Sequence, residues 1–95
     1  MQVDFEKAIT RLTERWEELT EGEKPIFVEI TAYWPRDQYV AYISCHALEK
    51  QQSMMFSSFT EAVKWLVSEI TAMIESEFYE QKNAYKHGGE KTWMN

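Results

Sequence analysis

The chain has 95 residues, of which 44% are hydrophobic and 15% aromatic, and its formal net charge is −6. This length supports one domain with a single core, and the aromatic content excludes a largely disordered chain. The acidic balance disfavours general binding to nucleic acid, because surfaces that bind phosphate backbones gather Lys and Arg.

The first element that the pattern predicts is an amphipathic helix over residues 5–21. Its apolar side chains recur every three or four positions, which places them on one face of a helix. Asp4 is expected to cap the start of this helix, and Gly22 to end it in the left-handed conformation. The apolar face consists of Phe5, Ala8, Ile9, Leu12, Trp16 and Leu19.

Two strands are predicted next, over residues 26–34 and 38–46. The turn Trp34-Pro35-Arg36-Asp37 joins them into an antiparallel hairpin, because Pro sets the backbone angle that the second turn position requires. A sheet covered on one face normally alternates apolar with polar side chains, but these strands are apolar on both faces. The second face carries Phe27, Tyr33, Val40 and Tyr42. It is therefore a candidate contact surface, although cross-strand packing within the sheet explains such residues equally well.

A short third strand over residues 53–57 is expected, after a turn over residues 48–52. Ser58 and Glu61 match a capping box, which predicts a second helix from residue 59 to about residue 83. The resulting order is α-β-β-β-α, an α+β fold of two layers with a three-stranded antiparallel sheet and both helices on one face. Residues 1–86 form this domain, and residues 87–95 are expected to be a flexible tail, because His87-Gly88-Gly89 should end the helix. The expected core is Phe5, Ile9, Leu12, Trp16, Val28, Ile30, Ala41, Ile43, Phe56, Val63, Leu66 and Ile70.

The second helix carries an additional apolar stripe that this core does not use. Glu77 lies at the centre of the core-facing stripe, so the helix should extend beyond the sheet from about that point. The additional stripe consists of Val67, Ile74, Phe78 and Tyr85. Exposed aromatic residues on a projecting helix indicate a helix–helix contact, either with a second copy in a homodimer or with the loop or tail folded back.

No pattern indicates catalysis, a metal or a cofactor. Cys45 is the single cysteine and is expected to be a buried, inert thiol, while its neighbour His46 points to the opposite face of the strand. The spacings of zinc ligands and the glycine-rich loops of nucleotide sites are absent from the sequence. We therefore expect no enzyme, no catalytic, cofactor-binding or metal site and no small-molecule substrate. The methionines are interpreted as packing residues.

The location predicted from the sequence is cytoplasmic. A single cysteine fits a reducing compartment, and the first residues lack the basic and apolar regions of a signal peptide. No apolar run approaches the roughly 20 residues that span a membrane.

The element order is similar to that of the double-stranded-RNA-binding domain, a family with basic residues at the start of its second helix and in its hairpin loop. Here residues 57–64 contain a single base, Lys64, and Arg36 in the turn is balanced by Asp37. The similarity is therefore one of element order, and it does not indicate RNA binding.

These observations predict a small acidic protein–protein interaction module. By analogy with other small compact proteins, such a module is expected to regulate or inhibit another protein. Its interface is expected among Phe27, Tyr33, Tyr42, Val67, Ile74, Phe78 and Tyr85. One alternative is an acidic mimic of nucleic acid that blocks a DNA-binding protein through Glu14, Glu17, Glu18 and Glu21. A further alternative is binding of single-stranded nucleic acid by the aromatic sheet face, although cations beside that face are few.

Overall fold

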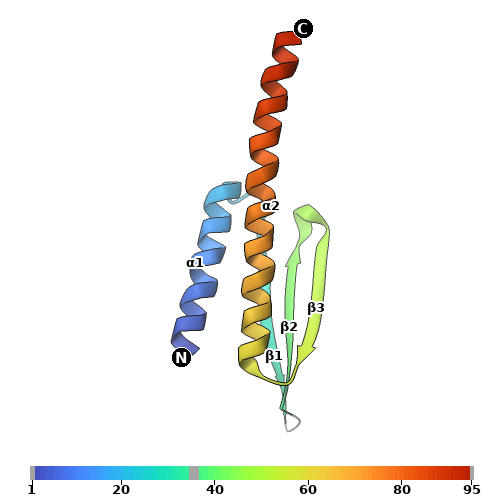
Figure 1. The fold of residues 1–95 in the computed structure, drawn as a ribbon. Coiled ribbons are helices and arrows are strands. Elements are labelled where there is room, and N and C mark those ends of the chain that lie inside the picture. Colours follow the sequence, from blue (N-terminus) through green and yellow to red (C-terminus); the bar gives the residue numbers. More distant parts are fainter. Residues whose placement is uncertain (1, 35–36, 95) are drawn as a thin grey trace.

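The computed structural model describes the backbone of residues 2–34 and 37–94 and the side chains of residues 6–34 and 37–83. In chain order the elements are α1 (Gln2–Thr20), β1 (Phe27–Tyr33), β2 (Gln38–Cys45), the 3-10 turn η1 (His46–Leu48), β3 (Lys50–Phe56) and α2 (Phe59–Met94). Figure 1 shows the two helices side by side, with α2 between α1 and the strands β2 and β3 in this view. The predicted α+β fold and the order α-β-β-β-α are confirmed.

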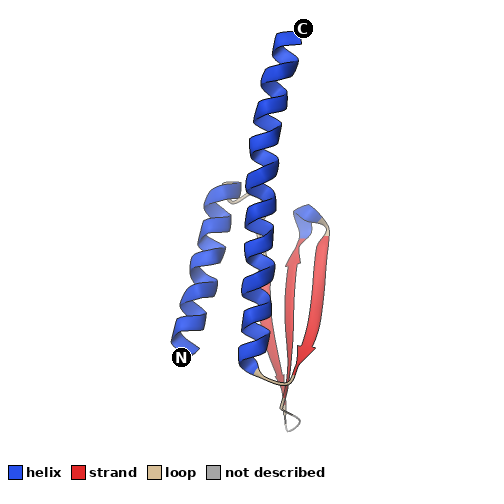
Figure 2. Cartoon of the chain, in the orientation of Figure 1, coloured by secondary structure: helices blue, strands red, loops and turns tan. Residues whose placement is uncertain are grey.

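The described strands form an antiparallel sheet in the order β1-β2-β3. Ala41, at the middle of β2, lies opposite Ile30 of β1 and Met54 of β3. Residues that face each other across an antiparallel pair point to the same side of the sheet. Ile30, Ala41 and Met54 therefore belong to the inner face, on the side where both helices lie (Figure 2).

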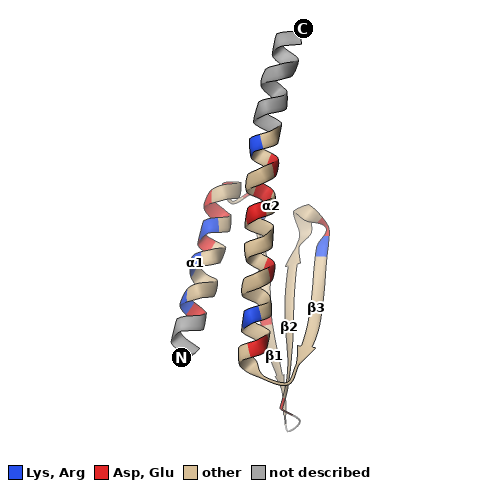
Figure 3. Cartoon of the chain, viewed as in Figure 1, with Lys and Arg blue, Asp and Glu red and all other residues tan. Residues whose placement is uncertain are grey.

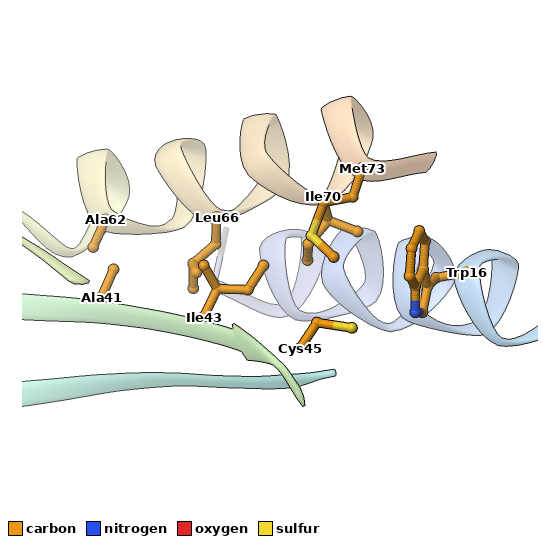
Figure 4. Packing of buried hydrophobic residues seen from close by; sticks show 8 residues of the cluster. All are labelled: Trp16, Ala41, Ile43, Cys45, Ala62, Leu66, Ile70 and Met73. Atoms are coloured by element: carbon orange, nitrogen blue, oxygen red, sulfur yellow. The ribbon is translucent and has the colours of Figure 1, made fainter. Parts of the chain in front are cut away.

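The core lies between α2, the inner face of β2 and the second half of α1 (Figure 4). Its fully buried side chains come from positions that share one face of each element, as the spacing predicted. Of the expected core, Trp16, Ala41, Ile43, Val63, Leu66 and Ile70 are buried, and Ile9, Leu12, Val28, Ile30 and Phe56 are partly buried. Cys45, Ala62 and Met73 complete the core, and the side chain of Phe5 lies outside the described residues.

The boundaries of α1 differ from the prediction by three residues at its start and by one at its end, although Gly22 is left-handed as predicted. The helix begins at Gln2, so Asp4 lies inside it and the predicted cap at Asp4 is wrong; Gln2 and Val3 do not break a helix. At the other end, the Gly22 N–H donates to the Glu17 carbonyl oxygen at 2.9 Å. Glu21 and Gly22 have φ of 56° and 71°, a Schellman-type ending in which Glu21 occupies the position that usually holds glycine.

The start of α2 is confirmed, since the Ser58 Oγ accepts a hydrogen bond from the Glu61 N–H at 3.1 Å. Its predicted end near residue 83 is wrong, because the helix continues through Gly88 and Gly89 to Met94. Each glycine weakens a helix by about 1 kcal/mol, but it keeps the backbone hydrogen bonds that a proline would remove. The division of the chain after residue 86 stays a prediction.

The third strand is confirmed but starts three residues earlier than predicted. Glu49 adopts a left-handed φ of 53°, and its N–H donates to the His46 carbonyl oxygen at 3.0 Å. This reverses the chain over η1 and a single further residue, so pairing with β2 already begins at Lys50. Glycine or asparagine usually marks such a left-handed position, and neither is present here.

The helices cover the sheet unevenly. α2 contacts all three strands, whereas α1 packs mainly on α2. β3 lies to one side of α2 in Figure 1, and its residues from Gln51 to Met55 are all exposed. The protein is elongated, at 64 × 24 × 18 Å, because α2 continues beyond the sheet.

Candidate protein-docking surface

The outer sheet face is the side of the sheet that points away from both helices. The ladder pairing fixes its members, because directly opposite residues share a face. They are Phe27, Glu29, Thr31 and Tyr33 of β1, Gln38, Val40, Tyr42 and Ser44 of β2, and Gln51, Ser53 and Met55 of β3. The structure thus brings the predicted residues Phe27, Tyr33 and Tyr42 onto one surface.

Large apolar side chains on this face are open to solvent. Phe27 is 67% exposed at one end of β1, and Tyr33 is 51% exposed at the other. Tyr42 lies between them on the central strand and is half-buried. Met55 of β3 is 57% exposed, and Trp34, which follows Tyr33 in the turn, is 88% exposed. The exposed rings are therefore spread over the face instead of being gathered in one pocket.

The outer sheet face carries little charge. Glu29 is the only charged side chain among the described residues that form it, and its Oε1 accepts a hydrogen bond from the Thr31 hydroxyl at 3.0 Å. The strands in Figure 3 are correspondingly almost free of charged positions, which concentrate on the helices and at the ends of the strands. Stacking surfaces for nucleic acid need cations beside the rings, and this face offers a carboxylate instead.

The predicted stripe on α2 is divided between the helix pair and solvent. Val67 and Ile74 are half-buried, and Ile74 packs against the core. Ile74 and Phe78 line one side of a groove whose other side is Leu19 of α1. In a layer of two helices, each helix needs one apolar side for the sheet and another for its neighbour. Most of the described stripe therefore serves the contact with α1. Phe78 is the described residue of the stripe whose side chain stays exposed to solvent, at 62%. The side chain of Tyr85 lies outside the described residues.

Glu77 is buried, although it was predicted to mark where α2 leaves the core. It is 5% exposed, and its Oε1 lies 2.5 Å from Lys24 Nζ, in the connection between α1 and β1. Gln81 Nε2, one turn later, donates to the Leu19 carbonyl oxygen at 2.9 Å. The connection after α1 and the last turn of α1 thus contact α2 at Glu77 and Gln81.

The ion pair shifts the titration of its lysine. Glu77 accepts a hydrogen bond from the Lys24 ammonium, and this bond raises the pKa of Lys24 above 10.5; partial burial opposes the shift and the negative charge of Glu77 reinforces it. Sequence reasoning placed neither residue in a site. The available signal was a carboxylate at the centre of an apolar stripe, which needs a cation when it is buried.

The backbone of Lys24 joins the same junction. Its carbonyl oxygen accepts a hydrogen bond from Trp16 Nε1 at 2.6 Å, and the Cys45 thiol lies 3.8 Å from it. Cys45 is fully buried, as expected, whereas His46 is exposed on η1. Cys45 and His46 therefore do not lie together on one surface, as a catalytic nucleophile and its base would. This junction is a structural joint between α1, α2 and the end of β2.

Sequence reasoning missed one member of the outer sheet face and one exposed ring in the turn beside it. Trp34 was assigned to the turn and Met55 was interpreted as a packing residue, yet both are largely exposed. Strand alternation carried the signal for Met55, since it shares a row with Thr31 and Val40. No periodicity indicates the orientation of a turn residue such as Trp34.

The described part of the chain also bears on metal binding and on membrane spans. There, no group of three or more His, Cys, Asp or Glu side chains is placed to hold a metal ion. Neither helix has, within the same residues, a stretch long and apolar enough to cross a membrane. Comparison of the chain with family models, with curated proteins and with solved structures finds no match.

Proposed function

We propose that the chain is a small protein-binding module, a regulator or inhibitor in class, whose docking surface is the outer sheet face. The observation that carries the proposal is the exposure of Phe27 and Tyr33, at 67% and 51%, on a sheet face that neither described helix covers. Aromatic residues are enriched at protein interfaces, where lysine and glutamate are depleted.

Packing within the sheet accounts poorly for these rings. Phe27 lies directly opposite Ser44, and Tyr33 lies opposite Gln38. The stabilising pairs of an exposed sheet join aromatic residues to each other or to β-branched residues across the ladder. Tyr42 and Val40 lie diagonally across the ladder from Phe27 and Tyr33, yet the two rings remain 67% and 51% exposed. This exposure favours a surface that contacts a partner over one that only stabilises the monomer.

The chemistry of the face also favours a protein over other ligands. A binding site for a small molecule is a concave pocket that buries most of its ligand, and these side chains are spread along three strands. A nucleic acid would meet Glu29 without a neighbouring Lys or Arg among the described residues of the face. The partner surface that fits is apolar at its centre and low in charge.

The test is binding of the chain and a double variant to one purified partner. The immobilised chain recovers candidates from a lysate of cells that produce it, and each candidate is then purified and titrated. We expect Phe27→Ser with Tyr33→Ser to weaken binding at least about a hundredfold, because truncated aromatic anchors typically cost 2 kcal/mol or more each. Affinity should change little with salt, since the contact is mainly apolar.

The matched control is Phe78→Ser with Tyr79→Ser, which removes two aromatic rings of similar exposure, 62% and 66%, from α2. This control should bind as the unchanged chain does. The proposal fails if every purified partner binds the Phe27 and Tyr33 variant with unchanged affinity.

A second candidate function rests on the acidic end of α1. Glu14, Glu17, Glu18 and Glu21 are all exposed and line one shallow depression beside Gly22. Such a surface would mimic a phosphate backbone and block a DNA-binding protein. Its affinity for the target would fall steeply with salt and with Glu14→Lys plus Glu17→Lys, and it would not respond to Phe27→Ser.

A further inference from the structure

β3 is an edge strand with one partner in the described sheet. It pairs with β2 over seven consecutive residues, from Lys50 to Phe56, without a bulge. An edge strand presents a row of backbone N–H and C=O groups on its free side, which is a template for another strand. Seven residues offer a template of about 23 Å.

The side chains of β3 do not protect this edge. Natural edge strands are guarded by charges, proline, bulges or a covering helix. Gln51 to Met55 are exposed on both faces of the strand and carry no charge. Lys50, the one charged residue of the strand, lies at its end and forms an ion pair with Glu69 at 3.2 Å.

The opposite edge of the sheet differs. β1 carries the exposed charge of Glu29 near its middle, a common guard of edge strands. Its Val28 and Ile30 line a groove together with Ile9 of α1, so a helix lies alongside this edge. A strand from another molecule therefore meets fewer obstacles at β3 than at β1.

The inner side of β3 borders an open groove. The groove, about 520 Å³ in volume, has β3 and η1 on one side and α2 on the other. Gln52 lines the strand side, and the small side chains of Ala72 and Ser76 line the helix side. Met54, further along the inner face, is 49% exposed. Gln52 and Met54 are therefore exposed inner-face residues of β3 beside α2.

We propose that β3 pairs antiparallel with β3 of a second copy of this chain, which joins the two sheets into one of six strands. A two-fold axis near Ser53, the middle residue of the strand, brings the same segment of each copy together. Both pairs of helices then lie on one face of the joined sheet. With α2 above β2, the two α2 helices are three strand spacings apart, or about 14 Å.

That separation suits the side chains present. Helices in direct contact pack 8–10 Å apart, so the wider gap accommodates Gln52 and Met54 from both strands under the small residues of α2. A stable dimer usually buries about 800 Å² on each partner, which is more than one strand edge supplies. Closing both grooves adds to the area that the joined edges bury, and the docking surface on the outer face stays open.

The charges favour the antiparallel arrangement. Glu69 is paired with Lys50, and Glu77 with Lys24, inside each copy. Glu49 and Glu80 are the other acidic residues of the groove, and Glu49 directly precedes β3. Antiparallel pairing moves the Glu49 ends of the two strands to opposite ends of the interface, about 20 Å or more apart. Screening at physiological salt acts over about 8 Å, so repulsion there is small.

Solution mass across a dilution series tests the proposal. The unchanged chain should form a dimer of twice 11.3 kDa. Met54→Lys places a charge on the free edge and should raise the dissociation constant at least about tenfold, because like charges then meet across the axis. Ala32→Lys is the matched control, since Ala32 is an exposed inner-face position on β1, and it should leave the dimer intact.

Two further variants distinguish a dimer through β3 from a dimer through the α2 stripe and from binding at the outer sheet face. Phe78→Glu should leave the mass unchanged, whereas a dimer through the α2 stripe would dissociate. Phe27→Ser with Tyr33→Ser should also remain dimeric, which separates this proposal from the docking surface. A monomeric unchanged chain, or a dimer that Phe78→Glu dissociates and Met54→Lys does not, overturns the proposal.

Hydrogen exchange gives a second readout that does not depend on the folding of any variant. In the dimer, the β3 amides on the free side should exchange more slowly than in a sample diluted to monomer, and β1 amides should not change. Equal exchange of β3 in the two samples would contradict strand pairing. Should Met54→Lys lose its circular-dichroism signal, Ser53→Lys on the outer face replaces it.

Discussion

Lys24 Nζ lies 2.5 Å from Glu77 Oε1, and this contact ties the connection after α1 to α2 across 53 positions of sequence. The carboxylate is almost fully buried, whereas the lysine side chain is 31% exposed. Burial of a carboxylate is costly without a cation beside it, so the lysine compensates for a charge that the core would otherwise exclude.

Removal of the lysine alone should therefore destabilise the fold. We expect Lys24→Met to lower the free energy of unfolding by about 1–3 kcal/mol, less than for a fully buried pair because solvent screens the exposed lysine. Lys24→Met with Glu77→Leu should recover most of the loss, since no buried charge remains. Lys50→Met is the control: its partner Glu69 is 26% exposed, against 5% for Glu77, so the variant leaves no buried carboxylate unpaired and should cost about 0–1 kcal/mol. Urea unfolding measures all four proteins, and equal losses for the two lysines would contradict this reasoning.

The same ion pair predicts a loss of stability at alkaline pH. The pKa of Lys24 is raised above 10.5 in the folded protein, so its contribution is complete below pH 10.5 and declines as the pH rises through the higher folded value. Lys24→Arg keeps its charge throughout this range. The free energy of unfolding of the unchanged chain should fall relative to Lys24→Arg above pH 10.5. A constant difference between them at all pH values would exclude this linkage.

Trp16 should be sensitive to loss of its indole N–H. It is 1% exposed, and its Nε1 donates to the Lys24 carbonyl oxygen at 2.6 Å. Trp16→Phe removes the hydrogen bond and leaves a void, and we expect a loss of about 2–4 kcal/mol in thermal or urea unfolding. Trp34→Phe, at a position that is 88% exposed, should change stability by less than about 0.5 kcal/mol. Similar losses of stability for the two variants would show that burial of the tryptophan does not determine the cost of its substitution.

Substitution of the two left-handed residues that end α1 should change the stability of the protein in opposite directions. Gly22 has a φ of +71°, and a Cβ added there would meet nothing within 4 Å, so Gly22→Ala should cost about 1 kcal/mol through backbone strain alone. Glu21 already bears such strain at φ 56°, and Glu21→Gly should gain about 0.5–1 kcal/mol. Thermal unfolding of the two variants checks the sign of each, and a loss for Glu21→Gly would refute the strain at that position.

Cys45 should react only when the protein opens. Its side chain is fully buried beside the Lys24 carbonyl, so a thiol reagent has no access in the folded state. The rate of alkylation should rise with urea in parallel with unfolding, and Lys24→Met should accelerate it without urea because the junction is weakened. Rapid labelling of the unchanged chain in buffer would contradict the burial.

Much of the fold follows from the periodicity of the sequence. Spacing of three and four placed Trp16, Leu66 and Ile70 on the core faces of two helices, and strand alternation placed Ala41 and Ile43 on the inner face. Such patterns report which side of an element is buried. They also indicated a second apolar face on the hairpin, and neither described helix covers it.

Contacts between distant segments could not be predicted in the same way. The apolar stripe with Val67 and Ile74 reads identically whether a neighbouring helix or a second molecule covers it. Pairing of Lys24 with Glu77 depends on where a loop crosses a helix, which no local spacing encodes. The early start of β3 likewise depends on Glu49 adopting a conformation that glycine usually marks.

The uneven cover of the sheet has a consequence for how the molecule opens. Ala41, Ile43 and Cys45 of β2 are buried in the core, and Val28 and Ile30 of β1 pack against it, whereas Phe56 is the described residue of β3 that does so. Segments with few buried apolar contacts open at a lower free energy than the whole domain. β3 should therefore detach and return while the rest of the protein stays folded, and a strand bound to its free edge would slow that local motion without changing the core.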